Sequence, residues 1–258
     1  MKTIHSHAGD IQIIYESGDF LVINKPAGLI VHKAAGNKSK ALIDYILESY
    51  PEIKKVGEDK SRPGIVHRLD KDASGLMIIA RNNQAFVAIK QQFKKRTIYK
   101  EYLALVHGQI IKDEGKIIFP LTRSKSGHKM AALPASNRAK KKLSNRDEGN
   151  IRARLKAKKA LSLFTVEKKW PHFSLVSVNI KTGRTHQIRA HFAAYGHALV
   201  GDDLYGTNKN KLKNKKMSLG RIFLVAKKLK FKDREGNTQE FQIDLPSDLK
   251  KIIDTLKK

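Results

Sequence analysis

The sequence predicts an α+β fold in which helices flank a mixed, mostly antiparallel sheet. Two observations support this prediction: strand-like and helical segments are intermixed, and several apolar runs are joined by short Gly-containing loops. With 258 residues, 40% of them hydrophobic, the chain is long enough to bury a sizeable core. We expect a short tail at residues 1–10, followed by a single domain over residues 11–258 without internal repeats.

The first half of the chain alternates strand and helix signals. The apolar runs Ile11–Tyr15 and Phe20–Asn24 flank a Gly-containing loop, which predicts a hairpin. Asn37 or Ser39 is expected to cap a helix that reaches Tyr50, because apolar residues recur there at helical spacing and a proline follows. The next expected elements are strands at Gly64–Val66 and Leu76–Ala80, a helix capped by Asn82 or Asn83, and strands at Thr97–Val106 and Gly115–Leu121.

The second half contains a basic stretch and then further strands and helices. Residues 122–159 are rich in Lys, Arg, Ser and Asn, and we expect their middle, Ala135–Arg152, to form a mobile basic loop. Lys209–Lys216 is a second basic segment. The remaining expected elements are a hairpin of Ala160–Lys168 and Phe173–Ile180, a helix from Thr185 to about Tyr195, strands Ile222–Ala226 and Phe241–Ile243 around a turn at Asp233–Asn237, and a helix at Leu249–Leu256.

Charge is the strongest global signal, with 52 Lys and Arg residues against 24 Asp and Glu, a formal net charge of +28. Such an excess favours nucleic acid as partner, because cations that neutralise phosphates release condensed counterions. A generally lysine-rich surface is the alternative, and an anionic membrane surface is less favoured because no basic amphipathic anchor helix stands out. No apolar run is long enough to span a membrane, and no signal region marks export, so we expect a cytoplasmic protein.

Several classes of chemistry lack their sequence signals. The chain has no cysteine, which excludes disulfides, thiolate zinc sites and a sulfur nucleophile. The sequence contains no HExxH, no GxGxxG, no GxxxxGK[ST] and no GxSxG pattern. We therefore expect neither a metal nor a cofactor.

Two segments carry candidate site residues. In the first, Arg62–Arg81, a polar centre lies between apolar runs, and Asp70 has basic neighbours within it. That aspartate is either a site residue or a turn residue that hydrogen-bonds its own backbone. In the second, Arg184–Arg189, we expect Thr185 to cap a helix whose free N–H groups can bind an anion. One arginine there could pair with Asp70 and lower its pKa, or the helix could simply be a basic surface.

Three segments together resemble the RluA family of pseudouridine synthases: HRLDKDASG (His67–Gly75), KEYLALVHG (Lys100–Gly108) and KTGRTHQIRAHF (Lys181–Phe192). DFLVINKPAGLIVH (Asp19–His32) and GHALVGDDLYG (Gly196–Gly206) agree with the resemblance. The five segments follow the family's order over most of the chain. Ala73 stands where the family commonly has threonine, which affects the turn more than the reaction.

The resemblance implies a pseudouridine synthase-like fold with a central active-site cleft and cofactor-free isomerisation of a uridine in RNA. Asp70 is then the nucleophile, attacking either C1′ of the ribose or C6 of the base. Tyr102 matches the tyrosine that packs on the flipped base, and Arg184 matches the arginine that pairs with the aspartate. Arg68 corresponds to the arginine that holds or replaces the flipped nucleotide. The residues expected to contact RNA are His67, Arg68, Lys71, Lys100, Thr185, His186, Gln187 and Arg189.

The expected partner is structured RNA, with ribosomal RNA favoured and transfer RNA as the other substrate class. We expect no counterpart of the family's frequent N-terminal S4-type RNA-binding module, and we expect the two basic stretches to contribute to RNA binding. We expect a monomer that does not bind membranes. The alternative function is that of a non-catalytic RNA-binding protein, such as a ribosome-assembly factor that kept the fold.

Overall fold

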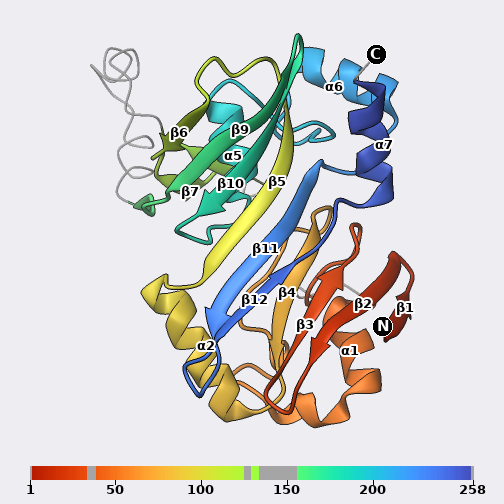
Figure 1. The fold of residues 1–258 in the computed structure, drawn as a ribbon, viewed down its shortest axis with the longest axis vertical. Helices are drawn as coiled ribbons and strands as arrows, with labels where there is room; N and C mark the ends of the chain where they lie inside the picture. Colours follow the sequence, from red (N-terminus) through yellow and green to blue (C-terminus); the bar gives the residue numbers. More distant parts are fainter. Residues whose placement is uncertain (1, 34–38, 125–128, 134–155, 257–258) are drawn as a thin grey trace. The chain divides into compact units, whose positions relative to one another are not determined.

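The computed structural model describes residues 2–33, 39–124, 129–133 and 156–256, and the chain forms two compact units (Figure 1). Unit 1 comprises Met1–Tyr102 and Leu224–Ser247, and unit 2 comprises Leu103–Phe223 and Asp248–Lys258. Strand β5 (Tyr99–His107) begins in unit 1 and continues into unit 2. The single domain predicted for residues 11–258 stays a prediction.

Unit 1 is built on strands that pair mainly antiparallel. They are β1 (Thr3–Ser6), β2 (Gly9–Glu16), β3 (Phe20–Lys25), β4 (Ser74–Ala80), β11 (Leu224–Lys232) and β12 (Thr238–Gln242). Successive strands from β1 to β4 pair antiparallel, β4 and β11 run parallel, and β12 forms an antiparallel hairpin with β11. The expected hairpin of β2 and β3 is confirmed. All seven residues of β4 are buried, so this strand lies at the centre of the unit.

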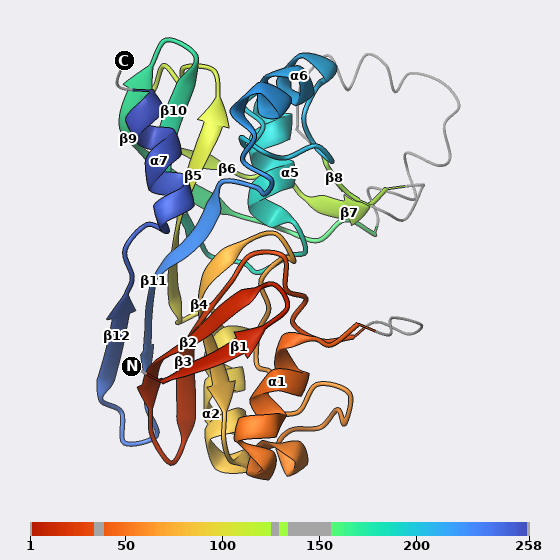
Figure 2. The ribbon, with the colours of Figure 1, turned by 90° about the vertical axis from the view of Figure 1, so that its right-hand side faces the viewer.

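Helices lie on one face of this sheet (Figure 2). They are α1 (Leu42–Ser49), the short 3₁₀ helix η1 (Pro51–Lys55) and α2 (Asn83–Lys95). Asn82 caps α2 as expected, because its side chain accepts a hydrogen bond from the backbone N–H of Ala85 (2.9 Å). Phe86 and Ile89 of α2 are buried, which confirms the predicted apolar face.

The expected cap of α1 is wrong. Ala41 occupies the N-cap position, and its backbone N–H donates to the Asp44 carboxylate (2.7 Å). Ser39 lies before this cap, and Asn37 falls outside the described residues. The acidic side chain of Asp44 in the first turn therefore takes the place of the expected polar cap. Its negative charge also interacts favourably with the positive end of the helix dipole.

Unit 2 contains a second group of antiparallel strands with helices beside it. Beyond β5 these elements are β6 (Glu114–Ile117), β7 (Leu121–Arg123), β8 (Met130–Ala132), β9 (Ser162–Trp170), β10 (Phe173–Ile180), α5 (Gln187–Ala194), α6 (Asn208–Met217) and α7 (Ser247–Thr255). The strand order within the unit is β5-β10-β9-β6, and β7 pairs with β8 separately. The expected β9–β10 hairpin and the terminal helix are confirmed. The segment expected as a mobile loop, Ala135–Arg152, lies outside the described residues.

Three local expectations need correction. Residues 1–10 are not a tail, because Thr3–Ser6 pairs with β2 across a turn at His7–Ala8, and Gly9, directly after this turn, has a φ of 115° that favours glycine. Gly64–Val66 is not a strand and contributes only an isolated antiparallel bridge between Ile65 and Ile79. Lys209–Lys216, expected only as a basic segment, is part of helix α6.

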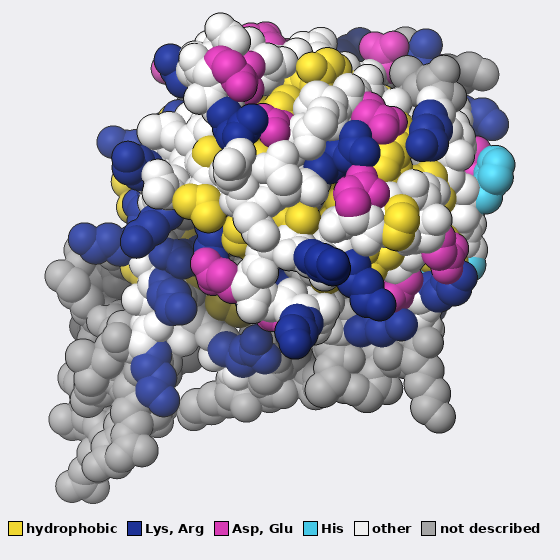
Figure 3. Space-filling view, turned by 90° about the horizontal axis from the view of Figure 1, so that it is seen from below, with side chains coloured by type: hydrophobic (Ala, Val, Ile, Leu, Met, Phe, Trp, Pro, Cys, Tyr) yellow, Lys and Arg dark blue, Asp and Glu magenta, His cyan; other side chains and the backbone are white. Residues whose placement is uncertain are grey.

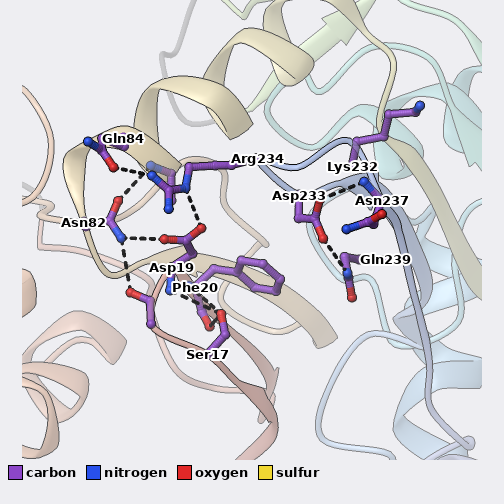
Figure 4. Close-up of polar contacts among 12 residues, drawn as sticks. Ser17, Asp19, Phe20, Asn82, Gln84, Lys232, Asp233, Arg234, Asn237 and Gln239 are labelled. Atoms are coloured by element: carbon purple, nitrogen blue, oxygen red, sulfur yellow. Dashed lines mark hydrogen bonds and ion pairs between the residues drawn. The ribbon is translucent and has the colours of Figure 1, made fainter.

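The turns at one end of unit 1 are joined by polar contacts (Figure 4). Arg234, in the β11–β12 turn, donates to the Asp19 carboxylate in the β2–β3 turn (2.6 Å) and to Gln84 of α2. The Asn82 side chain also donates to Asp19 (2.7 Å). Asp233 accepts from the backbone N–H of Asn237 (2.8 Å), which closes the β11–β12 turn predicted at these residues. Two hairpin turns and the start of α2 are thereby held together.

The surface of unit 1 at this end is rich in cations. Figure 3 shows Lys and Arg side chains spread over it, with fewer Asp and Glu side chains among them. None of the helices in the described ranges is both long and apolar enough to cross a membrane. Within the same ranges, no group of His, Asp and Glu side chains is arranged to hold a metal ion.

Helices flank mixed, mostly antiparallel strands in the described chain, and the predicted α+β fold class is confirmed (Figures 1 and 2). The parallel contact between β4 and β11 is the exception to the antiparallel pattern in unit 1. It joins residues far apart in sequence and directly follows the loop that carries Asp70.

The β4–β11 contact leads to a prediction about Gly75. A Cβ at Gly75 would lie 2.6 Å from the backbone nitrogen of Ala226, and the φ of Gly75 is 116°. We expect Gly75→Ala to lower the free energy of unfolding by more than about 3 kcal/mol, because it adds both a backbone clash and strain. Chemical denaturation measures this loss. Gly18→Ala is the control, since nothing lies within 4 Å of that position; equal stability of the two variants would contradict the prediction.

Candidate active site

Asp70 lies in a loop between the Ile65–Ile79 bridge and strand β4. Leu69 is buried, whereas Asp70 is half-buried. The backbone N–H of Ala73 donates to the Asp70 carbonyl (3.3 Å), which forms a tight turn. The backbone of Asp70 is thus held in place while its side chain stays partly accessible.

A buried cation holds the next residue of this loop. Lys25, at the end of β3, is fully buried. Its ammonium donates to three carbonyl oxygens, those of Pro26 (2.7 Å), Leu29 (2.8 Å) and Lys71 (3.1 Å). The backbone N–H of Gly28 donates to the same Lys71 carbonyl (2.8 Å). A buried ammonium requires such partners, and they fix the loop against the turn after β3.

Tyr102 lies on β5, also within unit 1, and exposes only 7% of its surface. Burial raises the pKa of the Tyr102 phenol, and the negative charge of Asp70 raises it further. The two side chains are therefore close enough to interact electrostatically. The phenol keeps its proton at neutral pH, and it offers an aromatic face together with an O–H group near the carboxylate.

Lys100 precedes Tyr102 by two residues on β5, so both side chains point to the same face of the strand. The Lys100 ammonium lies 5.3 Å from the centre of the Phe93 ring, and the His67 ring stacks on Phe93 at 4.7 Å. Burial lowers the pKa of Lys100 to about 8. A basic group whose pKa lies near neutral pH is therefore on the same face of β5 as Tyr102.

His67 is a neutral, inward-facing histidine. The backbone N–H of Ile78 donates to its Nε2 atom (2.9 Å), which requires that nitrogen to be unprotonated. Burial and the nearby Lys100 charge lower the pKa of His67 to about 3. The ring thus ties the Asp70 loop to β4, and its predicted contact with RNA stays a prediction.

The exposed cations of the loop are Arg68 and Lys71. Both side chains flank Asp70 in sequence and extend to solvent, which suits phosphate contacts. Their predicted roles in RNA binding stay predictions. Lys71 thus combines an exposed side chain with a backbone carbonyl that the Lys25 ammonium holds inside.

Arg184 lies in unit 2, in the loop before α5, and is half-buried. Its Nε donates weakly to the Lys159 carbonyl (3.4 Å), and its backbone N–H donates to the Gln187 side chain (3.1 Å). The predicted pairing of Arg184 with Asp70 joins residues of different units and stays a prediction. The local contacts fix the backbone of Arg184 against the start of α5.

Gln187 is 3% exposed, and both ends of its amide are used inside unit 2. Its Oε1 accepts from the Thr182 hydroxyl (2.7 Å), and its Nε2 donates to the Leu161 carbonyl (3.0 Å) and the Ser162 hydroxyl (3.1 Å). These bonds argue against the predicted RNA contact. Gln187 instead shapes the loop that presents Arg184.

Arg189 also points inward. Only 7% of Arg189 is exposed, and it forms a two-pronged ion pair with the fully buried Asp202 (2.7 and 3.0 Å). The Asp202 carboxylate also accepts from the backbone N–H groups of Leu204 and Tyr205 (both 3.1 Å). The structure thus corrects the RNA contact predicted for Arg189, because its guanidinium is already paired inside.

The start of α5 differs from the prediction. His186, with a φ of 51°, occupies the N-cap position that the sequence predicts for Thr185. The His186 Nδ1 atom lies 3.1 Å from the Tyr205 hydroxyl, which also accepts from the backbone N–H of Met130 (2.7 Å). Thr185 remains exposed. The RNA contacts of Thr185 and His186 stay predictions, and Tyr205, which the sequence does not single out, joins α5 to β8.

Unit 1 therefore places a carboxylate next to a protonated, buried phenol, on a loop that an internal ammonium fixes. A carboxylate in such surroundings can act as a nucleophile toward an electrophilic carbon. The phenol ring can pack against a planar ligand. Exposed cations beside it suit an anionic substrate.

Comparisons with known proteins point to one family. A family model described as RNA pseudouridylate synthase matches residues 19–194. The chain is 34% identical to an uncharacterized RNA pseudouridine synthase of Bacillus subtilis, over 96% of this chain and 74% of that protein. It is 32% identical to the ribosomal large subunit pseudouridine synthase D of Zymomonas mobilis, over 99% of this chain and 76% of that protein.

Two solved structures share the fold. Human RNA pseudouridylate synthase domain containing 4 matches with a TM-score of 0.72 and 22% identity, over 95% of this chain and 92% of that chain. Human RNA pseudouridylate synthase domain containing 1 matches with a TM-score of 0.68 and 24% identity, over 96% of this chain and 94% of that chain.

The internal ammonium leads to a stability prediction. Lys25→Met keeps a long side chain but removes the ammonium donor from the carbonyls of Pro26, Leu29 and Lys71, of which, among the described residues, only that of Lys71 keeps another donor, the Gly28 N–H group. We expect the free energy of unfolding to fall by about 3 kcal/mol, measured by urea denaturation. Lys71→Met is the control, because only the backbone of Lys71 takes part in the clamp. A Lys25→Met protein as stable as the control would show that the clamp is dispensable.

His67 leads to a prediction about acid stability. Its folded pKa of about 3 lies below its ordinary value of 6.5, so the unfolded state binds more protons between these pH values. Stability from this site is present above pH 6.5 and falls toward pH 3, by at most about 1.4 kcal/mol per pH unit. His67→Gln keeps an acceptor for the Ile78 N–H group and removes the titration.

Urea denaturation at about pH 7 and about pH 5 measures how much stability each protein loses on acidification. We expect His67→Gln to lose less stability than the wild type on acidification. His5→Gln changes an exposed histidine and serves as the control, which should follow the wild type. An unchanged acid sensitivity in His67→Gln would exclude His67 as the source.

Proposed function

The chain belongs to the RNA pseudouridylate synthase family, and from this premise we propose that Asp70 is the nucleophile that converts a uridine of structured RNA to pseudouridine without a cofactor. The observation that carries this proposal is the burial of Tyr102 next to the Asp70 carboxylate within unit 1. A turn residue with no chemical role would not need a buried phenol beside it. The exposed cations Arg68 and Lys71 suit the RNA backbone around the target.

The reaction is an isomerisation, so its atoms and electrons balance without a second substrate. In one route Asp70 attacks C1′, the N1–C1′ bond breaks, and the base turns so that C5 forms the new bond to C1′ as the carboxylate leaves. In the other route Asp70 adds to C6, the N1–C1′ bond breaks, C5 forms the new bond to C1′, and the carboxylate then leaves C6. Both routes end with loss of the C5 proton, uptake of a proton at N1 and return of the free carboxylate.

Tyr102 and Arg184 support the nucleophile in this proposal. The Tyr102 ring packs against the flipped uracil and recovers part of the few kcal/mol that unstacking costs. Arg184 pairs with Asp70 and orients the carboxylate. Water has to be kept from the reacting carbon during these steps, because it would otherwise hydrolyse a glycosyl intermediate.

Ribosomal RNA is the favoured substrate. The relative from Zymomonas mobilis is named for the large ribosomal subunit, and ribosomal RNA offers structured loops with accessible uridines. The residues proposed to contact it are Arg68, Lys71, Lys100, Thr185 and His186, with His67 positioning the loop. We propose that the protein acts as a monomer in the cytoplasm, with transfer RNA as the second substrate class.

Asp70→Asn tests the mechanism. The amide keeps the shape of the side chain but is a much weaker nucleophile, so we expect release of tritium from C5-labelled uridine in RNA to drop at least about a thousandfold. RNA affinity should stay within about threefold, because Asp70 does not attract phosphates.

Asp72→Asn is the matched control, since Asp72 lies in the same loop and is also half-buried. Its activity should remain near that of the wild type. Turnover by purified Asp70→Asn protein, from a host that lacks its own synthases, would exclude Asp70 as nucleophile. RNA binding without tritium release by the wild type would favour the non-catalytic alternative.

A further inference from the structure

Helix α6 is a strongly basic helix within unit 2. Its ten residues, Asn208–Met217, include no acidic residue. They contain five lysines, Lys209, Lys211, Lys213, Lys215 and Lys216. Pairs four residues apart, such as Lys211 and Lys215, repel each other and weaken an isolated helix. The helix therefore keeps a charge pattern that costs stability.

The fold holds this helix in place through one of its residues. Asn214 is 7% exposed, and its Oδ1 accepts from His107 Nε2 (2.8 Å) and from the backbone N–H of Gly201 (2.9 Å). The Asn214 Nδ2 atom donates to the Asp203 carboxylate (3.1 Å). On the same side, the Lys213 ammonium lies 6.0 Å from the centre of the Phe173 ring. Polar contacts thus fix the orientation of a helix that has no apolar face of its own.

The opposite face of α6 is directed to solvent. Leu212 is 63% exposed, and the residues three or four positions from it along the helix include Lys209, Lys215 and Lys216, all exposed. None of the ion pairs among the described residues of unit 2 includes a lysine of α6. The cations on this face are therefore not neutralised by the described part of the chain.

The segment before α6 connects it to the start of α5. The Arg189–Asp202 ion pair ties this segment to α5, and the Tyr205 hydroxyl lies 3.1 Å from His186 Nδ1. Figure 2 shows α6 beside α5 within unit 2. The basic face is thus rigidly connected to the loop that presents Arg184.

We propose that the outward face of α6 binds the phosphate backbone of a structured RNA segment next to the target uridine. The inference rests on the proposed function and extends it to a docking surface outside the catalytic residues. A ten-residue helix is about 15 Å long, and cations on one face of it suit the closely spaced phosphates of an RNA duplex. A membrane is not the partner, since Leu212 alone cannot supply the apolar face that membrane binding requires.

The charge variant Lys209→Gln/Lys215→Gln/Lys216→Gln tests the proposal. The probe is an in vitro transcribed large-subunit ribosomal RNA, titrated with protein from about 50 to about 200 mM salt. We expect the slope of log affinity against log salt to become shallower by about two to three, because each lost phosphate contact removes about 0.7 to 0.9. The arginine variant at the same three positions should keep the wild-type slope.

Lys94→Gln/Lys95→Gln/Lys232→Gln is the matched control. It also removes three exposed cations, two of them from the last turn of a helix that ends in a left-handed residue. These lysines belong to unit 1, whose cationic surface Figure 3 shows. We expect this variant to change the slope by less than one unit, so equal slopes in the two glutamine variants would overturn the docking role of α6.

Activity separates this inference from the proposed function. With a short target stem–loop the α6 variant should keep the wild-type kcat, whereas with the long RNA its KM should rise several-fold. If the wild type releases no tritium, the proposed function is refuted, and the salt titration still tests the docking role of α6. An α6 variant that binds long RNA like the wild type refutes the docking surface even if the wild type forms pseudouridine. Loss of binding to anionic phosphatidylserine vesicles, with RNA binding intact, would also refute it.

Discussion

The buried ammonium of Lys25 is the interaction on which the geometry of the candidate site depends. It joins the end of β3, the turn at Leu29 and the loop carbonyl of Lys71 at one point inside unit 1. A charge in such a place is stable only while all its partners remain in position. The same requirement holds the loop, and with it the backbone of Asp70, close to one conformation. Gly28 reinforces the clamp from the same turn.

Burial favours the uncharged form of three side chains in unit 1, those of Tyr102, His67 and Lys100. It keeps Tyr102 protonated and His67 uncharged, and it brings the pKa of Lys100 to about 8. At neutral pH Tyr102 and His67 are therefore uncharged, whereas Lys100 is still largely protonated, and exposed cations such as Arg68 lie outside. The exposed cations attract an anionic RNA backbone, and the neutral phenol ring of Tyr102 can pack against a planar base.

The segment Arg184–Arg189 serves mainly to build unit 2. Gln187 and Arg189 use their polar atoms for internal hydrogen bonds and an internal ion pair, and His191 bonds to the Ser162 hydroxyl (3.0 Å). Arg184 precedes this buried group and remains half-buried. A run of basic and polar residues in sequence therefore separates into residues that form the scaffold and a few that are presented to a ligand.

The sequence alone determined the fold class, the hairpins, the cap at Asn82 and the family, because these depend on local periodicity, on turn residues and on short motifs. It did not predict the cap at Ala41, the pairing of Arg189 with Asp202 or the role of Lys25. Each of these depends on which distant groups meet once the chain is packed. A lysine or arginine has the same local pattern whether it lies outside or inside, and only the tertiary structure decides whether its charge has a partner in the protein or faces solvent.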